Sequence, residues 1–367
     1  MERKRYYFID NIRWVVVLLV LLYHVFYNYN SLGVFGAIGS LGTNQWQDIV
    51  CTLLNPWFMP LLFIVAGASS KYALDHHTSK EFRTERRRKL LIPSTLGIMV
   101  FGWILGMINT ANAGIELPEG TPGWVIYLIA LPSGTAHLWF IQDLFGFSLL
   151  LLLVRKWLNV ERVNRWITTL SNRGMTLLIM GVFGALYVTS LTQVDNPTEA
   201  MGLLNLYRPI FYFACFLMGY YIFSSETMHD YLASKAKVLV VLAIMSATAF
   251  GIRFYGVDYT LPSVLQSPLC VLFCWTAILA MFGGFKRWAD KTTPVASYMA
   301  RSSFGIYIVH MTVCSATCIL LKSSTLPVWS IYLITITTTY LGSFLLWEIL
   351  RRIPFVRWCV FGIKVKK

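Results

Sequence analysis

Long apolar segments recur along this chain, and they restrict it more than any other feature does. Ten of them are long enough, or nearly so, for a helix to cross a hydrocarbon layer of about 30 Å. They cover residues 12–29, 48–70, 90–109, 137–154, 175–192, 208–224, 237–252, 263–283, 303–321 and 327–350. Charged residues make up only 13% of the chain, where soluble domains carry about 25%. Because lipid offers the backbone no hydrogen-bond partners, the sequence predicts an all-α polytopic membrane protein with about ten transmembrane helices.

The remaining segments do not suggest a second domain. The stretch WVIYLIALP at 124–132 is too short to span and ends at Pro132, so we expect an interfacial or re-entrant piece there. No stretch has the composition of a soluble domain or a low-complexity linker, so residues 1–367 are expected to form one membrane domain. No small-residue cleavage site follows the first apolar segment, which is therefore read as a helix and not as a removed signal peptide.

The basic residues report the topology. Of 31 Lys and Arg, 27 fall at the termini and in alternate loops on one side, against Arg208, Arg253 and Lys322 on the other and Arg13 in the first helix. This positive-inside asymmetry predicts that both ends are cytoplasmic. Since topology accounts for the net charge of +14, no nucleic-acid partner is expected. The expected surroundings are a lipid bilayer, taken to be a bacterial plasma membrane that the chain crosses several times.

The first apolar segment carries polar side chains along one face. Arg13 and His24 are 11 residues apart, which on an α-helix is about 16 Å along the axis and about 20° around it. Asp10 lies within about 40° of the same face and can pair with Arg13 at i, i+3. A histidine in a bilayer can be a hydrogen-bonded core residue or a functional group. A polar track from His24 to the cytoplasmic end favours function, because a packing histidine does not require one.

A basic cluster precedes the third segment. The loop HHTSKEFRTERRRKLLIP holds Arg86, Arg87, Arg88 and Lys89 next to one another. Two interpretations stay open. The cluster can be a positive-inside loop that contacts anionic lipid headgroups. Alternatively it can bind the phosphates of a nucleotide-like carrier, because forked guanidinium donors match phosphate oxygens.

Other polar side chains lie at the ends of apolar segments. SGTAHLWFIQDLF places His137 and Trp139 at the outer start of the fourth, and RSSFGIYIVH ends on His310 inside the ninth. Trp139 can also be an ordinary interfacial anchor. The seven cysteines are scattered through apolar segments without a CxxC pair, and no zinc signature is present, so no metal is expected.

Five motifs, in order, resemble the acyltransferase-3 family of integral membrane O-acyltransferases. The first is an Arg followed by ten residues and a His, here Arg13 and His24, preceded by YFID. The others are LLFIVAGASS, the arginine-rich loop that runs into LLIP, HLWF and SSFGIYIVH. The resemblance covers essentially the whole chain. Arg86 and Lys89 match an Arg-x-x-Arg motif of the family with Lys in the second position, and Ala66 with Gly67 stand where the family has Ser-Gly.

The resemblance implies transfer of an acyl group, commonly acetyl, from cytoplasmic acyl-CoA to a hydroxyl of a carbohydrate or another small acceptor. In that reading Arg86, Arg87, Arg88 and Lys89 bind the CoA phosphates and the pantetheine arm passes Arg13. His24 is the general base on the acceptor hydroxyl. Arg13 holds a phosphate or stabilises the oxyanion, and the substrate-lining candidates are Asp10, His137, Trp139 and His310.

Two other classes of function also accommodate these residues. A transporter or flippase of a sugar or lipid-linked intermediate would carry an intramembrane His and Arg too, but would move its substrate without cleaving a thioester. A membrane scaffold would have no reason to bury the polar face of the first helix. The acceptor and a homo-oligomeric state are left open by the sequence.

Overall fold

A computed structural model describes residues 5–32, 37–42, 46–112, 118–193 and 207–364, and within these ranges every regular element is a helix. The first half of the chain forms α1 (Tyr7–Asn28), η1 (Trp46–Asp48), α2 (Ile49–Leu54), α3 (Phe58–Leu74), α4 (Ser79–Arg86), the π-helical η2 (Arg87–Leu91) and η3 (Ile98–Gly102), α5 (Trp103–Asn112), α6 (Gly123–Ser133), η4 (Ala136–Leu138), α7 (Trp139–Val154) and α8 (Val160–Thr168). The second half forms α9 (Asn172–Ser190), α11 (Pro209–Tyr221), α12 (Glu226–Phe254), α13 (Pro262–Leu265), α14 (Pro268–Trp288), α15 (Pro294–Leu321), α16 (Val328–Leu350) and α17 (Pro354–Phe361).

The all-α polytopic architecture is confirmed. Among the described residues, 8 helical segments are long and apolar enough to cross a membrane. They are Tyr7–Asn28, Trp46–Leu74, Ala136–Val154, Asn172–Ser190, Glu226–Phe254, Pro268–Trp288, Pro294–Leu321 and Val328–Leu350.

The other two predicted spans are helical but shorter. The span predicted at 90–109 is interrupted around Pro93, whose ring removes a backbone N–H, and its apolar helix covers Ile98–Ala111. The span predicted at 208–224 becomes α11, which begins with Pro209 in its first turn and is 13 residues long. The short piece expected at 124–132 is helix α6, and it packs along α5.

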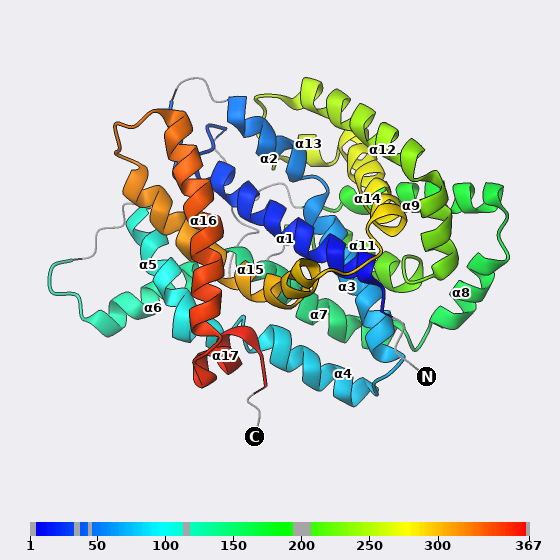
Figure 1. Ribbon diagram of the computed structural model, residues 1–367, viewed down its shortest axis with the longest axis horizontal. Helices are drawn as coiled ribbons and strands as arrows, with labels where there is room; N and C mark the ends of the chain where they lie inside the picture. The colour runs from blue at the N-terminus through cyan, green and yellow to red at the C-terminus, as the bar shows by residue number, and fades with distance from the viewer. Residues whose placement is uncertain (1–4, 33–36, 43–45, 113–117, 194–206, 365–367) are drawn as a thin grey trace.

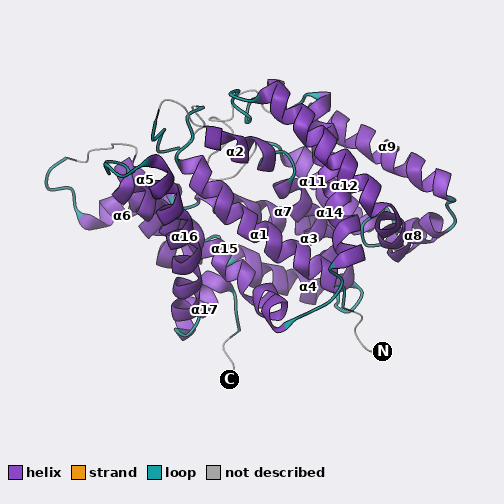
Figure 2. Ribbon diagram, turned by 45° about the horizontal axis from the view of Figure 1, so that its top comes forward, coloured by secondary structure: helices purple, strands orange, loops and turns teal. Residues whose placement is uncertain are grey.

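Helix α1 runs through the middle of the molecule (Figure 1) and packs against α3, α14, α15 and α16. The view in Figure 2 shows the same central position, with α12, α14, α9 and α8 on one side and α5, α6 and α16 on the other. Any polar side chain that α1 carries at its core-facing positions is therefore surrounded by other helices. This explains how a bilayer-spanning helix keeps an arginine and a histidine without exposing them to lipid.

Helices α3 and α11 meet through two glycines. A Cβ on Gly67 would clash with the carbonyl oxygen of Phe216, and a Cβ on Gly219 would clash with that of Ile64. Small residues let membrane helices approach this closely, and the contact area then supplies the attraction that the hydrophobic effect does not provide in lipid. The approach of α11 fixes the inner part of α3 beside α1.

The beginning of α1, helix α4 and helix α17 lie along one edge of the molecule, at the bottom of Figure 1. Arg88 in η2 donates from Nη1 to the carbonyl oxygen of Gly362, 2.7 Å away, so the segment after α17 is attached to the basic cluster. The two ends of the described chain therefore lie on the same side. The basic loops assign that side to the cytoplasm.

Candidate active site

Three histidines from distant parts of the chain converge beside the outer end of α1. His24 comes from α1, His137 from η4 and His310 from α15. The ring centroids are 4.9 Å apart for His24 and His310, 4.7 Å for His137 and His310, and 6.3 Å for His24 and His137. The fold therefore gathers the predicted base and two of the predicted acceptor-lining residues into one cluster.

The hydrogen bonds of this cluster determine which ring nitrogens carry protons. The Nδ1 atom of His310 lies 2.5 Å from the carbonyl oxygen of Tyr307, which can only accept, so Nδ1 donates and Nε2 of the neutral ring keeps its lone pair. Nδ1 of His24 lies 2.9 Å from the carbonyl oxygen of Val20 and 3.1 Å from Nε2 of His310. Both neighbours are acceptors, so His24 carries its proton on Nδ1.

The opposite nitrogen of His24 follows from this assignment. In the neutral ring, Nε2 has the lone pair, and no side chain or backbone group of the described residues bonds to it. His24 as a whole residue is less buried than the other two, since the exposed fraction is 0% for His310 and 5% for His137. Nε2 of His24 is therefore the ring nitrogen at which we expect a substrate to bind.

His137 is held from the other side. Its Nε2 donates to the carbonyl oxygen of Ile308, 3.1 Å away, and its own carbonyl accepts a bond from the Tyr307 hydroxyl. Its Nδ1 is buried and has no hydrogen-bond partner in the described chain. The ring also borders a small cavity next to Phe101 and Thr312. His137 and Tyr307 thus fix α15 against the start of α7 and keep His310 in contact with His24.

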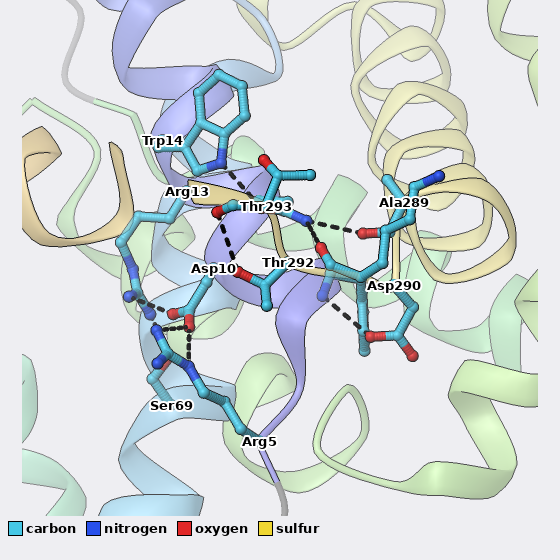
Figure 3. A network of polar contacts seen from close by, with 12 residues as sticks. Arg5, Asp10, Arg13, Trp14, Ser69, Ala289, Asp290, Thr292 and Thr293 are labelled. Atoms are coloured by element: carbon cyan, nitrogen blue, oxygen red, sulfur yellow. Dashed lines mark hydrogen bonds and ion pairs between the residues drawn. The ribbon is translucent and has the colours of Figure 1, made fainter. Parts of the chain in front are cut away.

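At the opposite, cytoplasmic end of α1, Arg13 belongs to a second polar network (Figure 3). It forms an ion pair with Asp10 at 3.1 Å, as the i, i+3 spacing predicts, and Asp10 also pairs with Arg5 at 2.8 Å. The Nη2 atom of Arg13 donates to the hydroxyl of Ser69 at 2.7 Å. Ser69 lies in α3, so the network joins the inner ends of α1 and α3.

Arg86 reaches the same place from α4. Its Nη2 donates to the hydroxyl of Ser70, 3.1 Å away, and Ser70 directly follows Ser69 in the chain. Arg13 is close enough to act electrostatically on Arg86. The Nε atom of Arg86 is buried and has no partner among the described residues. The guanidinium groups of Arg13 and Arg86 therefore contact two adjacent serines, and N–H donors of Arg86 remain without a partner among the described residues.

Burial affects the acid–base behaviour of Arg86. It lowers the pKa of the guanidinium to about 10; the nearby Arg13 cation lowers it too, and Glu85 acts in the opposite direction. Glu85 forms an ion pair with Lys89 at 2.6 Å, and this pairing holds its own pKa below the usual value despite partial burial. Arg86 is still a cation at neutral pH, and a bound anion would stabilise its charge.

The rest of the predicted basic cluster does not form one surface. Arg87 is exposed, Arg88 is bound to the carbonyl of Gly362, and Lys89 pairs with Glu85. Successive side chains on a helix point about 100° apart, so these four adjacent residues have different neighbours. Arg86 alone turns inward to Arg13.

Trp139 lies one residue past η4 but belongs to a different environment from the histidines. Its ring is 5.4 Å from Tyr212 and 6.2 Å from Phe63, between centroids. Sequence reasoning did not identify Tyr307, or the hydroxyls of Ser69 and Ser70 as partners of the arginines. A signal for Tyr307 existed, because it lies three residues before His310, on the same helix face.

No group of three or more His, Cys, Asp or Glu side chains suited to a metal ion occurs in the part of the chain that the structure describes.

Comparison with known proteins gives one result. Residues 6–348 match the family model described as the acyltransferase domain. No curated protein and no solved structure was found to match the chain.

Proposed function

Since the chain belongs to the acyltransferase domain family and is a membrane acyltransferase, we propose that it transfers an acyl group, acetyl in the first instance, from cytoplasmic acyl-CoA to a hydroxyl of a carbohydrate or another small acceptor. His24 is the general base in this proposal. The observation that carries it is the pair of acceptors on Nδ1 of His24, the Val20 carbonyl and Nε2 of His310. They hold the ring in the tautomer whose accessible Nε2 can take a proton.

His310 has a positioning role in the proposed reaction. Once Nε2 of His24 accepts the hydroxyl proton, the ring becomes an imidazolium and its Nδ1–H becomes a stronger donor. A neutral nitrogen acceptor at 3.1 Å then stabilises this cation and keeps the ring oriented. In many enzymes a further residue orients the catalytic base. Here His310 and the Val20 carbonyl would orient His24 in the same way.

Arg13 and Arg86 form the core of the proposed donor site. Both are cations at the cytoplasmic end of the polar face, both retain donor groups, and anchoring on Ser69 and Ser70 orients their guanidinium planes. Phosphate oxygens suit such a pair, because each guanidinium can donate two parallel hydrogen bonds. Arg87 is exposed at the mouth of this site and supplies additional attraction. Arg88 and Lys89 are assigned to structure instead, since Arg88 bonds to the Gly362 carbonyl, Lys89 pairs with Glu85, and neither bonds to Ser69 or Ser70 in the described chain.

The spacing of the two ends fits a long donor. Arg13 and His24 are separated by about 16 Å along α1. A phosphate bound at Arg13 therefore leaves the thioester of an extended pantetheine arm in the neighbourhood of His24. Helix α1 would form one wall along the whole arm.

The proposed step is a direct transfer. The acceptor oxygen attacks the thioester carbonyl carbon while Nε2 of His24 takes the hydroxyl proton, and the C–S bond then breaks. The thiolate of CoA takes the proton back from His24 and leaves as the thiol. Bonds and charges balance without a metal or a covalent enzyme intermediate.

The test uses the purified full-length protein in detergent and acetyl-CoA as the probe. Binding and thioester cleavage are measured for the wild type, for His24→Ala and for Arg86→Ala. Wild-type binding with turnover, loss of turnover but not binding in His24→Ala, and loss of binding in Arg86→Ala support both role assignments. Failure of the wild type to bind acyl-CoA of any chain length would refute the donor assignment. Normal turnover by His24→Ala would refute the proposed base.

A further inference from the structure

A buried cation on the outer side of the protein is left unused by this mechanism. Arg208, which precedes α11, is only 4% exposed. Its guanidinium carbon lies 4.1 Å from the ring centroid of Phe211 and 5.8 Å from that of Tyr212. Its Nε atom is buried and has no hydrogen-bond partner in the described chain.

The groups around Arg208 do not neutralise it. None of the ion pairs among the described residues involves this side chain. Arg208 acts electrostatically on Tyr207, Tyr212, Cys215, Cys270 and Cys274, and the Tyr212 side chain is also hydrogen-bonded to it. Cation–π contacts recover only part of the hydration energy that a guanidinium loses on burial. A bound oxyanion would recover the rest through bidentate hydrogen bonds.

Arg208 is connected to the base through aromatic rings. Tyr212 is stacked on Phe63 with centroids 4.9 Å apart, and it lies within electrostatic reach of Tyr23. The Tyr23 ring in turn is 5.4 Å from that of His24. Trp139, predicted from the sequence to line the acceptor side, packs on Tyr212. These rings are packed in the interior between the cation and the base, and Phe63 is fully buried.

We propose that Arg208 binds an anionic group of the acceptor, a carboxylate or a phosphate carried by a sugar, while a hydroxyl of the same molecule reaches His24. The substrate class is therefore an acidic carbohydrate. This inference rests on the acyl transfer proposed above and adds the recognition of charge on the acceptor side. An outer-leaflet lipid headgroup offers the same oxyanion chemistry. The acceptor is favoured because Arg208 is enclosed by protein and joined to the aromatic path.

The experiment measures binding, separately from catalysis. The full-length protein is placed in lipid nanodiscs of neutral lipid, and its Tm is recorded with D-glucose, D-glucuronate or D-glucose 6-phosphate. The variants are Arg208→Gln and Arg208→Lys. Arg253→Gln is the matched control, because Arg253 is also an outer-side arginine beside a phenylalanine ring, 5.1 Å from Phe254, but is exposed.

Glucuronate or glucose 6-phosphate should raise the Tm of the wild type and of Arg253→Gln by about 2–4 °C, and glucose should not. Arg208→Gln should lose this shift, and Arg208→Lys should retain part of it, which shows that the site stays folded. An equal shift in Arg208→Gln, or no shift in the wild type with either anionic sugar, would overturn the proposal. So would an Arg208-dependent shift that appears only when anionic lipid replaces the neutral lipid. Acetyl-CoA turnover is measured in parallel, so a failure of the donor assignment is recorded independently of anion binding.

Discussion

Nδ1 of His24 lies 3.1 Å from Nε2 of His310, although 286 positions separate the two residues in the chain. The contact joins the helix that carries the proposed base to the ninth predicted span, and it leaves the opposite nitrogen of His24 open. Four predictions test the chemistry that we assign to this contact and to the arginines at the other end of α1. A fifth tests the packing that holds the helices in place.

Replacement of His24 by Ala should lower kcat for acetyl transfer by about 10²- to 10⁴-fold, the usual contribution of a general base. The acetyl-CoA Kd should change less than threefold, because donor binding is assigned to Arg13 and Arg86. The rates come from release of free CoA thiol, and Kd comes from equilibrium binding. Tm is the control for folding, and a wild-type Tm combined with wild-type kcat would remove His24 from the mechanism.

His310 should act through His24 and not through substrate. His310→Leu removes the acceptor at Nε2 and should lower kcat by about tenfold, the equivalent of one hydrogen bond to a charged group. The KM for acetyl-CoA should stay within about twofold. His310→Gln supplies an amide oxygen that can accept from Nδ1 of His24, so it should recover part of the lost kcat. Equal losses in the Leu and Gln variants, with equal falls in Tm, would indicate a purely structural residue.

Because of Arg86, acetyl-CoA should bind more weakly at alkaline pH. Its pKa is lowered to about 10, so its charge is present at neutral pH and is lost as the pH rises through that value. Acetyl-CoA affinity of the wild type should therefore fall between about pH 9 and pH 11. Arg86→Met should bind at least tenfold more weakly at pH 7.5 and should lack this alkaline limit. Arg83→Met is the control, because Arg83 lies on the same helix but is exposed.

The lowered pKa of Arg86 also predicts an effect on the stability of the fold. The pKa of Arg86 is lower in the folded protein than the ordinary 12.5, so burial of its charge opposes folding fully below pH 10, and that cost decreases as the pH rises from 10 to 12.5. Arg86→Met should therefore have an equal or higher Tm at pH 7.5 while it binds donor less well. A clear loss of Tm in this variant would show that the guanidinium is mainly structural.

The close approach of α3 and α11 should make Gly67 intolerant of any side chain. Gly67→Ala forces a methyl group into the carbonyl of Phe216, so it should destabilise the protein by about 1–3 kcal/mol and lower its Tm. Gly146→Ala in α7 is the matched control, since nothing lies within 4 Å of the added methyl group. That variant should be neutral or slightly more stable. Thermal unfolding in one detergent compares the two, and equal Tm values would contradict the interlocked packing.

The fold class and the geometry along α1 could be predicted from the sequence, because they depend on local properties. Hydropathy located the 8 long apolar helices of the described residues, and the 11-residue spacing placed Arg13 and His24 on one side of a helix. The lengths of two spans could not be predicted, because Pro93 and Pro209 change where the backbone hydrogen bonds begin and end.

The partners of the site residues had to come from the tertiary structure. Arg86, Arg88 and Lys89 form one cluster in the sequence, but helical geometry points them in different directions, and Arg86 contacts Ser70 while Arg88 contacts Gly362. Lys89 pairs with Glu85. A run of basic residues in a sequence shows how many cations a loop carries. It does not show which of them form hydrogen bonds or ion pairs.

The sequence alone is enough to predict properties that depend on local segments. These are the helical spans, the side of the membrane for each loop, and the family to which the motifs point. Only the packed helices bring His310 to His24 and bury Arg208, which forms no ion pair with any residue that the structure describes. The physical reason is that apolar side chains are as compatible with lipid as with one another, so hydropathy does not specify which helices become neighbours. Shape at small residues and hydrogen bonds between helices make that choice, and both exist only once the helices are packed.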